Sequence, residues 1–141
     1  MRDLDRSGAG GGLAGALAAV GARLVDGFEL VADEIGLFDS ISEADLVVTG
    51  EGFLDQQSFE GKAVGGVAEL AAAAGVPVLA VVGDLDDEME RTDGWLRARD
   101  GAGSGFQVAS LVRTYGRERA WADPLGCIQS SVEAVLRERA S

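Results

Sequence analysis

The stretch from Asp45 to Lys62 constrains the fold of this chain more than any other. It begins with an uninterrupted apolar run, residues 46–48, which is typical of a strand buried on both faces of a parallel sheet. Two glycines then predict that the strand breaks into a polar loop, and from about residue 61 apolar residues recur at helical spacing: Val64, Val67, Ala68 and Ala71. The sequence therefore predicts a strand, a loop and a helix, with the loop where open α/β sheets bind their ligands.

The polar side chains of this loop are candidates for a binding site. Lys62 falls in the predicted first helical turn, where the helix dipole disfavours a cation unless an anion is bound there. An ammonium and helix amides can share one phosphate or carboxylate, although a lysine that simply points into water remains the alternative. Glu51 and Asp55 are interpreted either as solvated loop acids or as a carboxylate pair for Mg²⁺ or a substrate hydroxyl.

Two known motifs are excluded in this stretch. A phosphate-binding P-loop needs a glycine five residues before the Gly-Lys pair and a hydroxyl residue after it, whereas this chain has Gln56 and Ala63 there. The Gly-x-Ser-x-Gly elbow that presents a nucleophilic serine is also missing around Ser58.

A glycine run near the start, residues 8–12, is a second candidate binding segment. It precedes an Ala-rich predicted helix, residues 13–20, and a short predicted strand, residues 23–25, followed by Asp26. Residues 10–15 formally match a dinucleotide-binding motif, but that motif requires a strand before the glycines, and none is predicted there. We interpret the run as a close-approach loop at a helix N-terminus, for an anion or for tight packing, with these candidate residues: Gly8, Gly10, Gly11 and Gly12.

The remaining pattern predicts an α/β fold. Strands are predicted at residues 76–82 and 106–112, and helices at 27–37, 91–99, 117–122 and 124–139. The last helix carries an expected apolar face: Leu125, Ile128, Val132, Val135 and Leu136. We predict a single domain over residues 1–141, with residues 1–7 frayed, built as a Rossmann-like three-layer α/β/α fold on a small, mostly parallel sheet of three or four strands.

Five acids between residues 84 and 90 follow the second predicted strand. They are interpreted as a solvated loop whose acids stabilise a helix N-terminus, with an approach to a Mg²⁺-nucleotide as the alternative.

Composition excludes several classes of function. A net charge of −12 disfavours nucleic acid and anionic membranes as partners. Without histidine there is no imidazole base, so a general base must be Asp, Glu or Lys. The single cysteine, Cys127, rules out an internal disulfide and is expected in the core. No signal peptide or membrane-spanning run is visible, so we expect a cytoplasmic location.

Taken together, these residues resemble the C-terminal signature of the bacterial glycerate kinases. That signature has a buried strand, Thr-Gly-Glu-Gly, an apolar residue and Asp, then Gln-Ser and Gly-Lys. This chain has them in the same order and spacing: Thr49-Gly50-Glu51-Gly52, Leu54-Asp55, Gln57-Ser58 and Gly61-Lys62. The glycine run and residues 21–31 also resemble the family, which commonly has Arg at the position of Phe53 and often Pro at Val64.

The resemblance implies ATP-dependent phosphorylation of glycerate to phosphoglycerate in a cleft between two domains, with Mg²⁺ on the nucleotide. It places Glu51, Asp55 and Lys62 in catalytic roles, and it assigns nucleotide or substrate binding to Thr49, Gly50, Gly52, Ser58 and the glycine run. The metal ligands stay unassigned, and Phe53 puts the substrate preference in question.

The family's larger N-terminal portion has no counterpart in this sequence, so we expect a partner: an identical chain or a separate N-terminal half. The alternative function is a non-catalytic module that binds a phosphate or nucleotide ligand.

Overall fold

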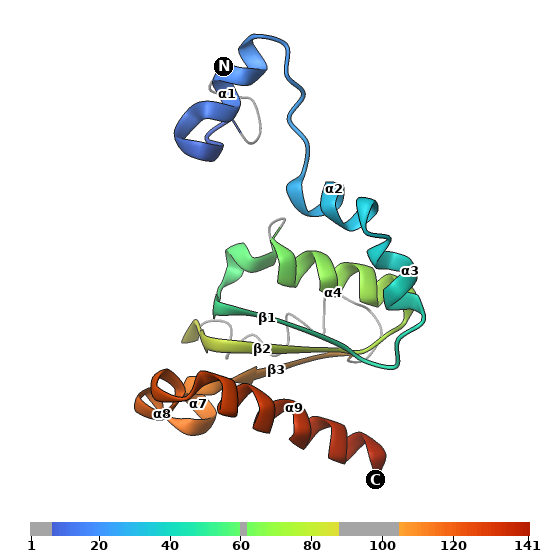
Figure 1. The fold of residues 1–141 in the computed structure, drawn as a ribbon, viewed down its shortest axis with the longest axis vertical. Helices are drawn as coiled ribbons and strands as arrows, with labels where there is room; N and C mark the ends of the chain where they lie inside the picture. The colour runs from blue at the N-terminus through green and yellow to red at the C-terminus, as the bar shows by residue number, and fades with distance from the viewer. Residues whose placement is uncertain (1–6, 60–61, 88–104) are drawn as a thin grey trace.

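The computed structural model describes residues 7–59, 62–87 and 105–141. In these residues a sheet of parallel strands runs in the order β1 (Val47–Leu54), β2 (Val78–Leu85) and β3 (Phe106–Ser110). Helix α4 (Ala63–Ala74) covers one face of the sheet, and α9 (Pro124–Ala140) covers the other together with α7 (Leu111–Tyr115) and α8 (Arg117–Ala122) (Figure 1). The predicted three-layer α/β/α fold is confirmed.

The predicted strand-helix-strand unit is also confirmed. Helix α4 connects β1 to β2, which pair in parallel from Val47 opposite Val78 onward. The helix ends at Gly75, whose φ of 71° is left-handed and therefore suits glycine. The buried residues of α4 are Val64, Gly65, Gly66 and Ala71. The two glycines let the helix lie close to the turn at Ser58 and to the Phe28 ring.

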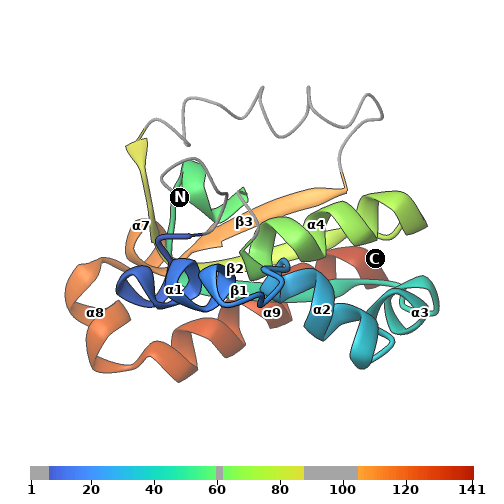
Figure 2. The same cartoon turned by 90° about the horizontal axis from the view of Figure 1, so that it is seen from above.

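Strand β1 differs from its prediction in two ways. It continues through Gly50 and Gly52 to Leu54, so the predicted break into a loop at those glycines is wrong. A Cβ atom at Gly50 would collide with the carbonyl oxygen of Val81, so here glycine permits close strand pairing and does not end the strand. The predicted burial on both faces is wrong as well, because β1 is an edge strand (Figure 2) and Val48 is 48% exposed.

The core consists of two layers, one on each face of the sheet. Between the sheet and α4 lie Leu54, Val64, Ala80 and Val82, whereas Leu79, Val81, Leu111 and Cys127 lie between the sheet and the helices α7–α9. The alternation along β2 follows from the two-residue period of a strand. Cys127 is fully buried, as predicted.

The N-terminal segment stands away from the sheet (Figure 1). A 3₁₀ turn, η1 (Ala9–Gly12), leads into α1 (Leu13–Ala19), and residues 22–26 then run without regular structure to α2 (Gly27–Glu34) and α3 (Leu37–Ser42). The strand predicted at residues 23–25 is therefore wrong, because no strand of the described sheet lies beside it. Asp26 caps α2 by accepting hydrogen bonds from the amides of Phe28 (2.9 Å) and Glu29 (3.1 Å).

The C-terminal part follows the predicted order with two shifts. Strand β3 ends at Ser110, not at residue 112, because the Ser110 hydroxyl accepts a hydrogen bond from the Arg113 amide and begins α7. Helix α9 buries Cys127, Ser131 and Val135 against the core. The buried side of α9 therefore differs from its predicted apolar face, of which Leu125, Ile128 and Leu136 are exposed to solvent. The helix predicted at residues 91–99 and the acids at residues 88 and 90 lie outside the described residues.

Candidate functional site

The candidate residues gather where the parallel strands end. Because β1, β2 and β3 run in the same direction, their carboxyl ends meet at one edge of the sheet (Figure 1). The turn η2 (Gln56–Phe59) follows β1 there, the acids from Asp84 to Asp87 end and follow β2, and α7 follows β3. This edge is where open α/β sheets place their ligands.

A reciprocal set of hydrogen bonds fixes the turn after β1. The Asp55 carboxylate accepts hydrogen bonds from the Ser58 amide (3.0 Å) and the Ser58 hydroxyl (3.2 Å), while that hydroxyl oxygen also accepts one from the Asp55 amide (3.1 Å). Ser58 is fully buried. In the described structure its hydroxyl is thus engaged in holding the shape of the turn, and Asp55 is held in one position by three contacts.

Lys62 stands at the start of α4, close to this turn. It is the N-cap residue, one position before the first helical turn, in which the sequence predicts it. Its Nζ lies 3.9 Å from Asp55 Oδ1, and its side chain is 50% exposed. Lys62 is also the only lysine in the sequence. Its ammonium therefore lies at the positive end of the helix dipole, oriented by one carboxylate and open to solvent.

Glu51 and Thr49 lie on β1 itself and not in the loop that follows it. Val47 packs against Ile41 and Ala71 on the α4 side of the sheet, and alternate residues of a strand share a face, so Thr49 and Glu51 project toward α4 as well. Within the described residues, Oε1 of Glu51 is buried and has no hydrogen-bond partner. A buried carboxylate oxygen without a partner is costly, so it requires a physical reason.

A cleft opens on the opposite face, beneath the ends of β1 and β2. It encloses about 580 Å³, and Gly52 and Gly83 lie in its wall. A Cβ atom on Gly83 would collide with the Gly52 carbonyl oxygen, so glycine is required where these strands approach. The other lining residues are mostly apolar: Phe53, Asp84, Leu111, Val112, Arg117, Ala120, Trp121 and Pro124. Trp121 in this lining is 76% exposed.

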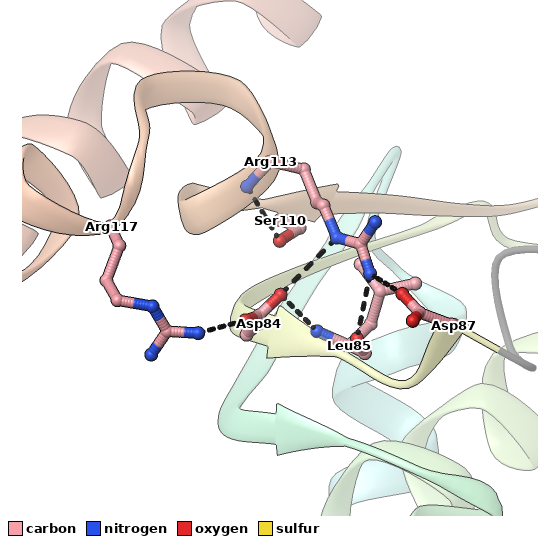
Figure 3. A network of polar contacts seen from close by, with 6 residues as sticks. All are labelled: Asp84, Leu85, Asp87, Ser110, Arg113 and Arg117. Carbon is pink, nitrogen blue, oxygen red and sulfur yellow. Dashed lines mark hydrogen bonds and ion pairs between the residues drawn. The ribbon is translucent and has the colours of Figure 1, made fainter.

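Two arginines that the sequence interpretation did not single out bind the acids after β2 (Figure 3). Asp84 forms ion pairs with Nε of Arg113 (3.5 Å) and Nη2 of Arg117 (3.4 Å), and it accepts a hydrogen bond from the Leu85 amide (2.9 Å). Arg113 also pairs with Asp87 and donates to the Leu85 carbonyl oxygen (3.4 Å). The acids at 84 and 87 thus have cationic partners, and within the described residues no group of three acid, histidine or cysteine side chains could hold a metal ion.

Phe53 and the same two arginines line one depression of about 510 Å³ at this edge. Asp84, Asp86 and Asp87 line the same depression, so its acids outnumber the two arginines. The available signal in the sequence was the position of Arg113, directly after the third predicted strand.

The glycine run lies apart from the Thr49–Lys62 stretch. Gly10, Gly11 and Gly12 have left-handed φ angles of 62°, 67° and 96°, so glycine suits these positions. In Figure 1 they lie with α1, beyond α2 and away from the sheet edge. The described structure does not bring Gly8, Gly10, Gly11 and Gly12 together with Lys62, and their role in binding stays a prediction.

Comparison with known proteins identifies the family of this chain. A model of the glycerate kinase family matches residues 1–137. The chain belongs to the glycerate kinase family. It is 45% identical over 91 residues to the glycerate kinase of Halalkalibacterium halodurans and 40% identical over 90 residues to the glycerate 2-kinase of Escherichia coli K12. The glycerate kinase of Neisseria meningitidis serogroup B is 45% identical over 87 residues.

These matches cover most of this chain but little of each relative. They include 61–64% of this chain and only 23–24% of the relatives' lengths, so the chain spans about a quarter of the glycerate kinases it matches. This coverage is consistent with the expected resemblance to the C-terminal portion. No solved structure matches the chain significantly. Among the described residues, no helix is long and apolar enough to cross a membrane.

Proposed function

We propose that this chain is the C-terminal portion of a cytoplasmic glycerate kinase, and that it binds part of the substrates for ATP-dependent phosphorylation of glycerate to phosphoglycerate. Membership of the family supports the reaction class. The single structural observation that carries the site is the orientation of the sole lysine, at the N-terminus of α4, by the Asp55 carboxylate. Phosphoryl transfer depends mainly on positioning and on stabilising negative charge, which such a group supplies.

The residues of the site are proposed to divide these tasks. Lys62 and the first amides of α4 hold an anionic group, either a nucleotide phosphate or the glycerate carboxylate. Asp55, held by Ser58, positions Lys62, and these three residues form one unit. The unpartnered oxygen of Glu51 is available to orient the substrate hydroxyl or a metal ion. Thr49, Gly50 and Gly52 are proposed to bind substrate or nucleotide.

Mg²⁺ fits the donors that are present. Magnesium bound with nucleotides uses one or two protein carboxylates, with phosphates and water completing its shell. In the described structure Glu51 offers one uncommitted carboxylate oxygen, while Asp55 is shared with Ser58 and Lys62. The bound ion would neutralise charge on the transferring phosphate. Glu51 is therefore the proposed protein ligand, and nucleotide phosphates and water would be the other ligands.

Calorimetry with two matched variants tests the binding role. The full chain is titrated with Mg²⁺-ATP and with glycerate, alongside Lys62→Ala and, as a control cation far from the site, Arg137→Ala. Arg137 pairs locally, at 3.2 Å from Glu133 on α9. Lys62→Ala is expected to weaken binding at least tenfold with little change in melting temperature, while Arg137→Ala keeps it. Equal binding by all three proteins would reject the role of Lys62.

The second candidate function is a non-catalytic module that binds a phosphate or nucleotide ligand. It is favoured by one observation, the coverage of only a quarter of the relatives' length. An assay of the chain with ATP, Mg²⁺ and glycerate separates the two functions. Turnover by the isolated chain refutes the module, whereas ligand binding without turnover, even after addition of the remaining kinase polypeptide, refutes the catalytic proposal.

A further inference from the structure

Helix α9 leaves one apolar side uncovered. Ile128 is 39% exposed, Leu136 is 49% exposed and Leu125, at the helix start, is 77% exposed. Val132, between them, is partly buried against the core. Because Ile128, Val132 and Leu136 follow one another at intervals of four residues, they form a single stripe along the helix. We call these three residues the α9 stripe.

The α9 stripe faces the β1 side of the molecule. The Arg139 guanidinium donates a hydrogen bond to the Asp45 carbonyl oxygen at 3.1 Å, and Asp45 lies just before β1. At 3.6 residues per turn, Arg139 projects within about 60° of every residue of the stripe. The stripe therefore shares the side of α9 that reaches toward β1, whereas Cys127, Ser131 and Val135 face the sheet interior.

Strand β1 has an open edge on the same side. Within the described residues β1 pairs only with β2. The Val47 amide donates a hydrogen bond to the Pro77 carbonyl oxygen on the β2 side, so the backbone N–H and C=O groups of Val48 and Gly50 point away from β2. The Val48 side chain alternates with Val47, which packs toward α4, so Val48 projects to the α9 face and is 48% exposed. An unpaired parallel edge beside an apolar stripe is a site for strand addition.

We propose that this β1–α9 groove, formed by Val48, the open β1 edge and the α9 stripe, binds the polypeptide that glycerate kinases carry outside the matched quarter. That polypeptide would add a strand to β1 and cover the stripe with apolar side chains. Only 24% of the Halalkalibacterium halodurans enzyme is matched, so most of its polypeptide is available to be this occupant. The groove also combines an open strand edge with exposed apolar side chains, a surface that parallel sheets normally bury. A second copy of this chain is the competing occupant. The proposal deepens the proposed function, on which it rests, by naming the surface that completes the kinase.

Co-expression tests the groove without relying on catalysis. The full chain is produced with the Halalkalibacterium halodurans glycerate kinase polypeptide lacking its matched segment, and co-purification is measured. Ile128→Glu is expected to reduce recovery of the complex at least tenfold. Ser130→Glu is the matched control, because Ser130 is exposed on the opposite side of the same helix. Failure of the unaltered chain to co-purify, or equal loss with both variants, overturns the proposal.

Thiol labelling of the chain alone and in the complex gives a second readout. Ile128→Cys should react rapidly in the isolated chain and at least tenfold more slowly in the complex, whereas Ser130→Cys should react equally in both. Slow labelling of Ile128→Cys in the isolated chain, with the mass of a dimer in solution, would assign the groove to a second copy and overturn the proposal. A large fall in melting temperature for Ile128→Glu alone would show that the stripe is core, and would also overturn it. Because neither readout is phosphoryl transfer, the groove and the proposed function can fail separately.

Discussion

Gly65→Ala sets helix propensity against packing at the start of α4. Alanine in a helix is favoured over glycine by about 1 kcal/mol. A Cβ atom at position 65, however, would lie 2.6 Å from the Phe59 Cα and 2.8 Å from the Ser58 carbonyl oxygen. Carbon atoms in contact normally lie about 3.5–4.0 Å apart, and both of these neighbours are backbone, so the turn that holds Asp55 must move by about 1 Å.

The packing cost should exceed the gain in propensity. Overpacking costs about 1–3 kcal/mol, and two backbone contacts shorter than 3 Å place this substitution in the upper part of that range, at about 2–3 kcal/mol. After the gain in propensity of about 1 kcal/mol is subtracted, the expected net loss in the free energy of unfolding is about 1–2 kcal/mol, or about 3–8 °C in melting temperature. Gly27→Ala is the matched control, because Gly27 begins α2 and a Cβ atom there would have nothing within 4 Å. It should be neutral or stabilising. Thermal unfolding followed by circular dichroism measures both, and a Gly65→Ala variant as stable as the unaltered chain would refute the described contact of α4 with the turn.

Two further substitutions test the charges at the sheet edge. Glu51→Gln removes the charge of a half-buried carboxylate, one oxygen of which is buried with no described partner, so the stability of the ligand-free chain should rise by up to about 1 kcal/mol. A clear loss of stability in urea unfolding would mean that the protein itself pairs with Glu51. Asp84→Ala removes a carboxylate, 21% exposed, that pairs with both Arg113 and Arg117, and it should cost about 1–2 kcal/mol, less at high salt. Glu133→Ala, which breaks an exposed pair with Arg137, should cost no more than about 0.5 kcal/mol, and equal costs for the two variants would contradict the network.

Local patterns predicted most of the elements but not their surroundings. The β-branched apolar run of β2 favoured a strand and the spacing of apolar residues in α4 favoured a helix, and both predictions were confirmed. Gly50 was misread because a glycine that breaks a strand and one that permits close strand pairing look alike until the neighbouring strand is known. The short strand expected at residues 23–25 failed because a strand needs a partner, and no described strand lies beside that segment.

The candidate site was predictable only in part. Motif spacing placed Asp55, Ser58 and Lys62 together, and the described contacts among them agree with that grouping. Arg113 and Arg117 were missed because their approach to Asp84 depends on how α7 and α8 fold back over the sheet, which no local pattern encodes. Helical spacing predicted the apolar residues of α9 but not what they pack against, and Leu125, Ile128 and Leu136 stay exposed.

Lys62 provides the most direct test of the proposed anion site. As the only lysine, it can be followed by mass spectrometry after brief reaction with an amine-selective reagent, with the N-terminal amine as the internal reference. With saturating Mg²⁺-ATP and glycerate, modification of Lys62 should slow at least fivefold while the N-terminal amine reacts as before. An unchanged rate at Lys62, under conditions where calorimetry shows ligand bound, would contradict the assignment of this lysine to the ligand.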